Sequence, residues 1–123
     1  IIDVLRKKIP LEKLQKFSAE DLWTTETVVY ELFYGIYFTG ENIAEKEQQM
    51  AAILDTFTHI LPFDRKSAVK AAHIGGTLAR TGQMLDHPDT LIAGSLSAHG
   101  CTKFLTKNKR DFERVKELDV LSL

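Results

Sequence analysis

The sequence has a single cysteine, three prolines and no apolar run long enough to cross a membrane. One cysteine cannot form an internal disulfide, which fits a reducing compartment. A membrane-spanning helix would need about 18 or more consecutive apolar residues, and the chain opens without the pattern of a signal peptide. These absences argue against a disulfide-rich or membrane-spanning class, and they predict a cytoplasmic protein.

Internal repeats, low-complexity tracts and Gly/Ser-rich linkers are also absent. The 123 residues, 44% hydrophobic and 27% charged, fit one globular domain over residues 1–123. The net charge of −1 gives no overall attraction for a polyanion. Cationic residues do gather in the last fifth of the chain, at Lys103, Lys107, Lys109, Arg110, Arg114 and Lys116. They form either a solvated surface or a rim that contacts phosphates.

Strand and helix patterns alternate along the chain. After two short amphipathic segments at 1–8 and 11–17, strands are expected at 21–25, 58–63, 101–106 and 118–123. Helices are expected over 26–38, 41–57, 65–81 and 89–99, with a loop and short helix at 108–115. Thr24 or Thr25 can cap the first of these helices and Asp64 the third, while Gly40, Gly82 and Gly100 stop helices.

Strands that alternate with helices predict a parallel sheet covered on both faces. Ligands bind such sheets beyond the carboxyl ends of the strands, so functional residues are expected after 21–25, near Asp89 and after 101–106. Residues 1–8 suit a helix better than the central strand with which an open parallel sheet usually begins. We therefore expect that the domain is truncated at its N-terminus, with its first strand missing.

Glu31 is the first unusual acid, because it lies inside the largely apolar and aromatic stretch VVYELFYGIYF at 28–38. On a helix its same-face neighbours are Thr27 and Gly35. Gly35 lowers helix propensity by about 1 kcal/mol relative to Ala, which indicates that space is needed there. A charge taken out of water normally pairs, protonates or binds a metal. Glu31 therefore either reaches solvent from a mostly buried helix or faces such a partner.

Asp89 is the second unusual acid, and it opens the small, apolar segment DTLIAGS. It is either an ordinary helix cap or a carboxylate held at a buried helix start, whereas Asp86 is expected to be a supporting or surface residue. A third group follows the strand at 101–106, where Thr106, Asn108 and Asp111 supply a hydroxyl, an amide and a carboxylate. Each is also a common turn residue, but the expected topology brings all three sites to one edge of the sheet.

The order and spacing of these motifs resemble the PIN domain, and most closely the toxin ribonucleases of VapC type. The motifs are IIDVLRK near the start, TVVYELFYG, ILPFD, AAHIGGTLARTG, DTLIAGSLSAHG and FLTKNKRDFERV near the end. The resemblance covers essentially the whole chain. It implies an α/β fold with three α/β/α layers around a central, mostly parallel sheet.

The resemblance also implies a function, because a cluster of acids in that family binds Mg²⁺ or Mn²⁺. Glu31, Asp89 and Asp111 fall on the positions that supply the cluster, so they are the implied catalytic and metal-binding residues of an endoribonuclease. Thr106 and Asn108 would support them. The implied contacts to the RNA backbone come from Lys107, Lys109 and Arg110.

The implied partners are an RNA substrate, a VapB-like antitoxin that neutralises the enzyme, and a second copy of the chain in a homodimer. The aromatic residues of the helix at 26–38 agree with an interface, since they exceed what one helix face can bury. They are Tyr30, Phe33, Tyr34, Tyr37 and Phe38.

The chain departs from the family pattern at its start, where the family's first acid has no counterpart and Asp3 resembles a later, less critical acid. A non-catalytic PIN-like interaction domain therefore stays open as an alternative. A receiver-like phospho-acceptor domain, with Asp64 after a strand, is a third possibility that explains neither Glu31 nor Asp89. The four histidines lack HxxxH or Cys/His spacing, so no zinc site is expected, and Cys101 is expected to be buried.

Overall fold

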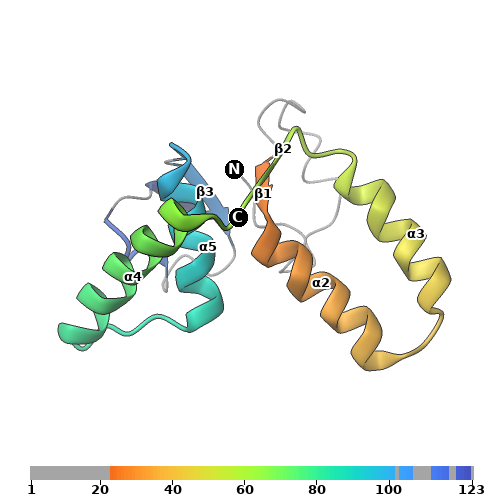
Figure 1. The fold of residues 1–123 in the computed structure, drawn as a ribbon, viewed down its shortest axis with the longest axis horizontal. Helices are drawn as coiled ribbons and strands as arrows, with labels where there is room; N and C mark the ends of the chain where they lie inside the picture. Colours follow the sequence, from red (N-terminus) through yellow and green to blue (C-terminus); the bar gives the residue numbers. More distant parts are fainter. Residues whose placement is uncertain (1–22, 102, 107–111, 117–118, 123) are drawn as a thin grey trace.

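The computed structural model describes residues 23–101, 103–106, 112–116 and 119–122 (Figure 1). The expected segments at 1–8 and 11–17, and residues 107–111, lie outside these ranges. Along the chain the elements are β1 (Trp23–Thr25), α2 (Glu26–Thr39), α3 (Ile43–Leu54), β2 (His59–Leu61), α4 (Arg65–Arg80), α5 (His87–Ala98), β3 (Lys103–Thr106) and β4 (Asp119–Ser122).

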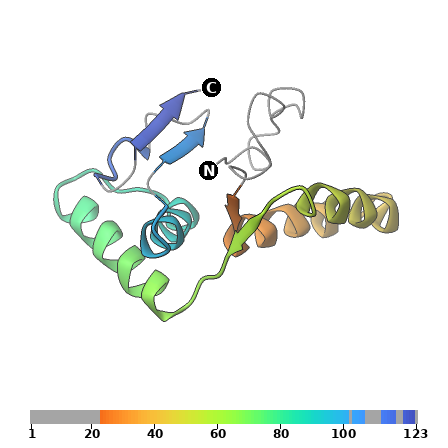
Figure 2. The same cartoon turned by 90° about the horizontal axis from the view of Figure 1, so that it is seen from above.

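The described strands form two parallel pairs (Figure 2). In the first pair β1 lies beside β2, with Trp23 opposite His59. In the second pair β3 lies beside β4, with Lys103 opposite Asp119 and Thr106 opposite Ser122. Parallel strands require long crossover connections, and helices supply one between β1 and β2. The expected mixture of helices with parallel strands is confirmed.

Helices α2 and α3 form an antiparallel hairpin that begins directly after β1 (Figure 1). The Oγ1 atom of Thr25 accepts a hydrogen bond from the Val28 N–H at 3.3 Å and so caps α2. The helix ends at Gly40, whose φ of 69° is a left-handed conformation suited to glycine. The expected cap and the expected stop are therefore both confirmed. Helix α3 buries none of its residues, all of which are described.

Helices α4 and α5 pack closely against each other. The Asp64 carboxylate caps α4 by accepting a hydrogen bond from the Ser67 N–H at 3.1 Å, as expected. Helix α5 begins at His87, two residues before the expected start, because the fixed φ of Pro88 suits the first turn of a helix. Asp89 therefore lies inside the first turn, and the reading of Asp89 as the helix cap is wrong.

The hydrophobic core draws on both halves of the described chain, and α4 and α5 together supply five of its eleven buried members. Its buried members are Val28, Leu61, Ile74, Leu78, Leu85, Ile92, Ala93, Leu96, Cys101, Phe112 and Val115. Trp23 and Leu32 pack against this cluster. The core therefore anchors the start of α2 and the middle of α5 to the same apolar interior. None of the described helices is long and apolar enough to cross a membrane.

Candidate active site

Glu31 lies on the second turn of α2, close to the carboxyl end of β1. Its side chain is half-buried, and its Oε1 atom is shielded from solvent. Apart from the α2 backbone and the adjacent residues, no described atom lies within 4 Å of the position that a Cβ on Gly35 would occupy. This agrees with the expectation that the helix leaves room on the face of Glu31.

Asp89 lies in the first turn of α5 with only 3% of its surface exposed, and its Oδ1 atom is shielded from solvent. The neighbouring Thr90 fixes this turn, because its Oγ1 donates to the carbonyl oxygen of Asp86 at 2.9 Å. Helix α4 covers the same turn at Gly75, where an added Cβ would lie 2.9 Å from Cγ2 of Thr90. Asp86 itself is exposed, as expected.

The helices that carry the two acids are in contact, and α5 also contacts β1. Figure 1 shows α2 and α5 on either side of the central β1 strand. The two shielded carboxylate oxygens thus come from adjacent helices, one of which starts at the carboxyl end of a parallel strand. Ligands of open parallel sheets bind near that edge.

The third expected group is only partly described. Thr106 is the last residue of β3, so its backbone lies at the carboxyl end of that strand as expected. Asn108, Asp111 and the cationic residues Lys107, Lys109 and Arg110 lie outside the described residues. Within the described ranges, no group of three or more His, Cys, Asp or Glu side chains is placed to hold a metal ion. The metal-binding role of Asp111 stays a prediction.

A family model of the PIN domain matches residues 1–118 of the chain. The chain belongs to the PIN domain family. No curated protein matches this PIN domain at a significant level.

Solved structures similar to this PIN domain come from toxin and antitoxin pairs. DNA-bound VapBC from Salmonella typhimurium matches with a TM-score of 0.83 and 19% identity over 98% of this chain and 95% of that chain. VapBC2 from Rickettsia felis, bound to a DNA fragment from its promoter, matches with a TM-score of 0.80 and 20% identity over 98% of this chain and 90% of that chain. FitAcB from Neisseria gonorrhoeae matches with a TM-score of 0.79 and 21% identity over 98% of this chain and 96% of that chain. At these identities the likeness establishes the shared fold.

The chemistry of the two acids in this PIN domain fits a divalent metal. Carboxylates are hard oxygen ligands, which Mg²⁺ and Mn²⁺ prefer over nitrogen or sulfur. One oxygen each of Glu31 and Asp89 is removed from bulk water. Away from water, these oxygens would attract a bound cation more strongly than surface carboxylates do. Mg²⁺ usually keeps several waters and takes only one or two carboxylates from the protein. Two shielded carboxylates therefore match the number of protein ligands that this ion needs.

Among the described residues, the other titratable groups of the PIN domain do not form a competing site. His59, His73 and His87 are exposed on β2, α4 and α5. Burial raises the pKa of the Cys101 thiol to about 11, so the thiol is protonated at neutral pH and is a weak nucleophile. Asp64, the acid considered for a phospho-acceptor, accepts hydrogen bonds from both the backbone and the hydroxyl of Ser67. It therefore acts as a helix cap.

Sequence reasoning missed the residues that hold Asp89 in place. Thr90 and Gly75 were not singled out, although together they fix the first turn of α5 beneath α4. The available signals were the Asp–Thr pair at the start of a helix and the Gly–Gly pair inside α4. A glycine in a helix interior costs about 1 kcal/mol relative to Ala, so its presence often marks a close approach of another element.

Proposed function

We propose that this PIN domain is a metal-dependent endoribonuclease of the VapC type, which hydrolyses RNA phosphodiester bonds. One observation carries the proposal: Glu31 and Asp89 come from two helices in contact, and each holds a carboxylate oxygen shielded from solvent. Membership of the PIN family supports it. Asp111, on the segment after β3, is proposed as the third acid of the cluster.

The acids would hold Mg²⁺ or Mn²⁺, which when bound lowers the pKa of a water and offsets negative charge on the phosphate. Glu31 and Asp89 would fix the position of the metal ion, because both are carried by helices anchored in the core. Thr106, the last residue of β3, and Asn108, two residues later in the sequence, would orient a water or a phosphate oxygen. Lys107, Lys109 and Arg110 would hold the RNA backbone through its phosphates.

We also propose that the protein assembles as a homodimer, acts in the cytoplasm and is neutralised by a VapB-like antitoxin. Support comes from the similar structures, one of which is described as a member of the VapBC family of toxin-antitoxin systems. The exposed aromatic residues of α2 agree with a protein partner.

The test is cleavage of single-stranded RNA by the full-length protein with Mg²⁺, beside Glu31→Gln and Asp89→Asn. Each substitution keeps the shape of the side chain and removes its charge, so we expect at least about a 100-fold loss of rate, equivalent to about 2.7 kcal/mol of transition-state stabilisation. The matched controls are Glu26→Gln and Asp86→Asn, which alter exposed acids at the starts of the same helices. Both should retain wild-type cleavage, and thermal unfolding should show that all four variants fold.

Cleavage that persists in both acid variants, or in excess chelator, would contradict the nuclease proposal. A folded full-length protein that binds an antitoxin but cleaves no RNA with Mg²⁺ or Mn²⁺ would instead favour the non-catalytic interaction domain.

A further inference from the structure

A hollow lies between the C-terminal half of α4 and the segment at 112–116. Its volume is about 570 Å³, within the roughly 300–1,000 Å³ of pockets that hold small ligands. Neither Glu31 nor Asp89 lines it. Its floor consists of apolar side chains that belong to the core, namely Ile74, Leu78 and Val115. It is called the α4 hollow below, and the candidate active site leaves it without a role.

The rim of the α4 hollow carries cations and hydrogen-bonding groups. The cations are Arg114 and Lys116, and the polar groups come from α4 and the loop that follows it, at His73, Thr77 and Gln83. His73 and Thr77 are four residues apart, so they share one face of α4. None of the described residues that line the hollow is an acid. The chemistry of the rim therefore favours an anionic ligand.

Hydrogen bonds join the two walls of the α4 hollow. The Nη1 atom of Arg114 donates to the carbonyl oxygen of Met84 at 2.9 Å, and the Gln83 N–H donates to the carbonyl oxygen of Leu78 at 2.8 Å. Arg114 is half-buried, so its guanidinium is held beside the hollow. A planar guanidinium can pair with two oxygens of one phosphate. The walls are thus fixed before a ligand arrives, which lowers the entropy lost on binding.

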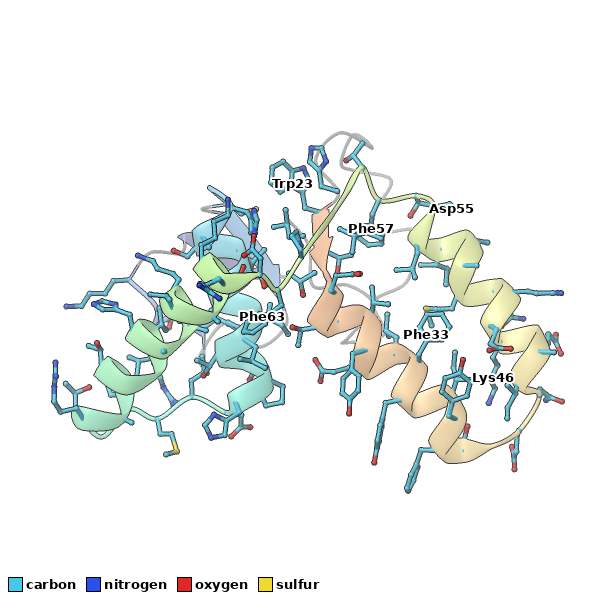
Figure 3. All side chains as sticks on the ribbon, viewed as in Figure 1. Trp23, Phe33, Lys46, Asp55, Phe57 and Phe63 are labelled. Carbon is cyan, nitrogen blue, oxygen red and sulfur yellow. The ribbon has the colours of Figure 1, made fainter. Side chains whose placement is uncertain are left out.

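The charge around the α4 hollow differs from that of the α2–α3 hairpin. Residues 70–85 and 112–116 contain four Lys or Arg and one acid, which gives a net charge of +3. Residues 26–55 contain six acids and one lysine, Lys46, which gives −5. Lys46 lies on α3, at the opposite end of the described chain from α4 (Figure 3). A phosphate-bearing ligand is therefore attracted to the α4 half and repelled from the other.

We propose that the α4 hollow binds a nucleoside phosphate, either one nucleotide of an RNA chain or a free nucleotide. The phosphate would pair with Arg114 and Lys116. The ribose or base would cover the apolar floor, and His73, Thr77 and Gln83 would hydrogen-bond its polar edge. The RNA source deepens the proposed function and rests on it, whereas the free nucleotide does not.

The test follows the amide signals of Thr77, Gln83 and Val115 by NMR in the full-length protein. Titration with uridine monophosphate should shift these signals saturably, and uridine, which lacks the phosphate, should bind at least about tenfold more weakly. Lys116→Glu should weaken binding of the monophosphate at least about tenfold, because it places a like charge beside the phosphate. The matched control is Lys66→Glu, which alters an exposed lysine of α4 outside the hollow and should bind as wild type does.

Arg114→Lys tests the guanidinium itself, because it keeps the charge and removes the planar pair of donors. Binding of the monophosphate should fall about tenfold. Thermal unfolding shows whether each variant folds. Lys116 is exposed, so the result for Lys116→Glu stands even where Arg114→Lys is unstable.

A ten-residue uridine oligonucleotide, kept intact by excess chelator, distinguishes the two sources of the nucleotide. If it binds more tightly than the monophosphate, and Lys116→Glu lowers the salt slope of its binding by about 1, the hollow takes RNA. If it fails to displace the monophosphate, the hollow takes a free nucleotide. Either result supports the proposal.

Other results would overturn the proposal. They are equal binding of uridine and its monophosphate, signal shifts confined to residues outside the hollow, or wild-type binding by Lys116→Glu. A hexaglutamate peptide that binds more tightly than the monophosphate would assign the hollow to an acidic peptide instead.

The titration with uridine monophosphate is repeated with Asp89→Asn to separate this inference from the nuclease proposal. Asp89 lies on α5, outside the α4 hollow, so binding should persist in that variant. Binding without RNA cleavage would contradict the nuclease proposal alone, and cleavage without binding would contradict this inference alone.

Discussion

The two helical hairpins of this PIN domain use their residues in opposite ways. Helix α5 buries seven of its twelve residues, whereas α3, of the same length and fully described, buries none. The α4–α5 pair builds the core and fixes Asp89, while the α2–α3 pair is anchored mainly at its base, through Val28 and Leu32. A buried half thus supplies stability and Asp89, and an exposed half supplies Glu31 and an unburied aromatic face.

Matched leucine truncations should give the largest difference between the hairpins. Leu96 in α5 is 1% exposed, so Leu96→Ala removes a fully buried side chain and should lower the free energy of unfolding by about 3 kcal/mol. Leu54→Ala removes the same atoms from a half-buried site in α3 and should cost less than about 1.5 kcal/mol. Urea denaturation of both variants measures the difference. Equal losses would show that the α2–α3 hairpin contributes as much to stability as the core pair.

Glycine substitutions test the same contrast through close packing. A Cβ on Gly94 would lie 2.5 Å from Cβ of Ala71 and 2.8 Å from the Ala71 backbone, so Gly94→Ala forces α4 and α5 apart and should destabilise by about 2 kcal/mol. Gly76→Ala in α4 is the control, since no described atom outside the α4 backbone and the adjacent residues lies within 4 Å of its added Cβ. It should stabilise by about 0.5 kcal/mol through chain entropy. A stable Gly94→Ala variant would contradict the close approach.

The elements with strong local signals were predictable from sequence. Thr25, Gly40 and Asp64 set helix ends through bonds to nearby backbone groups, and their roles follow from residue type and spacing. The start of α5 was misplaced because Asp89 looked like a cap, whereas Pro88 belongs inside the first turn. The start of α5 also depends on the packing of its first turn against α4, where Gly75 approaches Thr90.

The candidate site was predictable only as single residues. Glu31 stood out because a carboxylate inside an apolar helix needs an explanation, and Asp89 because small residues follow it. That their helices touch is a tertiary fact, and so is the contact of Gly75 with Thr90 that fixes the turn. Local propensity does not encode contacts between residues far apart in sequence.

The Asp64 cap should make the stability of α4 depend on pH. The hydroxyl of Ser67, followed by its N–H and by His99 at 3.4 Å, holds the pKa of Asp64 below its usual 3.8. A lowered pKa in the folded state contributes stability above pH 3.8 that is lost as the pH falls below it. Asp64→Ala should therefore lower Tm at pH 7, with the difference shrinking as the pH falls below 3.8. Asp86→Ala is the control, because Asp86 makes no cap bond in α5.

The smallest expected effect lies in the exposed hairpin, at the hydrogen bond from Tyr37 to Glu47. This bond, with some desolvation and the Glu47 charge, raises the pKa of the Tyr37 phenol above 10.0. A raised pKa contributes stability below pH 10 that is lost as the pH rises above it, but both groups are exposed and Tm should barely change. Tyrosine NMR, assigned with Tyr37→Phe, should show the pKa returning toward 10.0 in Glu47→Gln and staying raised in Glu45→Gln. An unchanged pKa in Glu47→Gln would mean that α3 does not hold the Tyr37 ring, and the contrast with the tightly packed α4–α5 pair would then be larger by one contact.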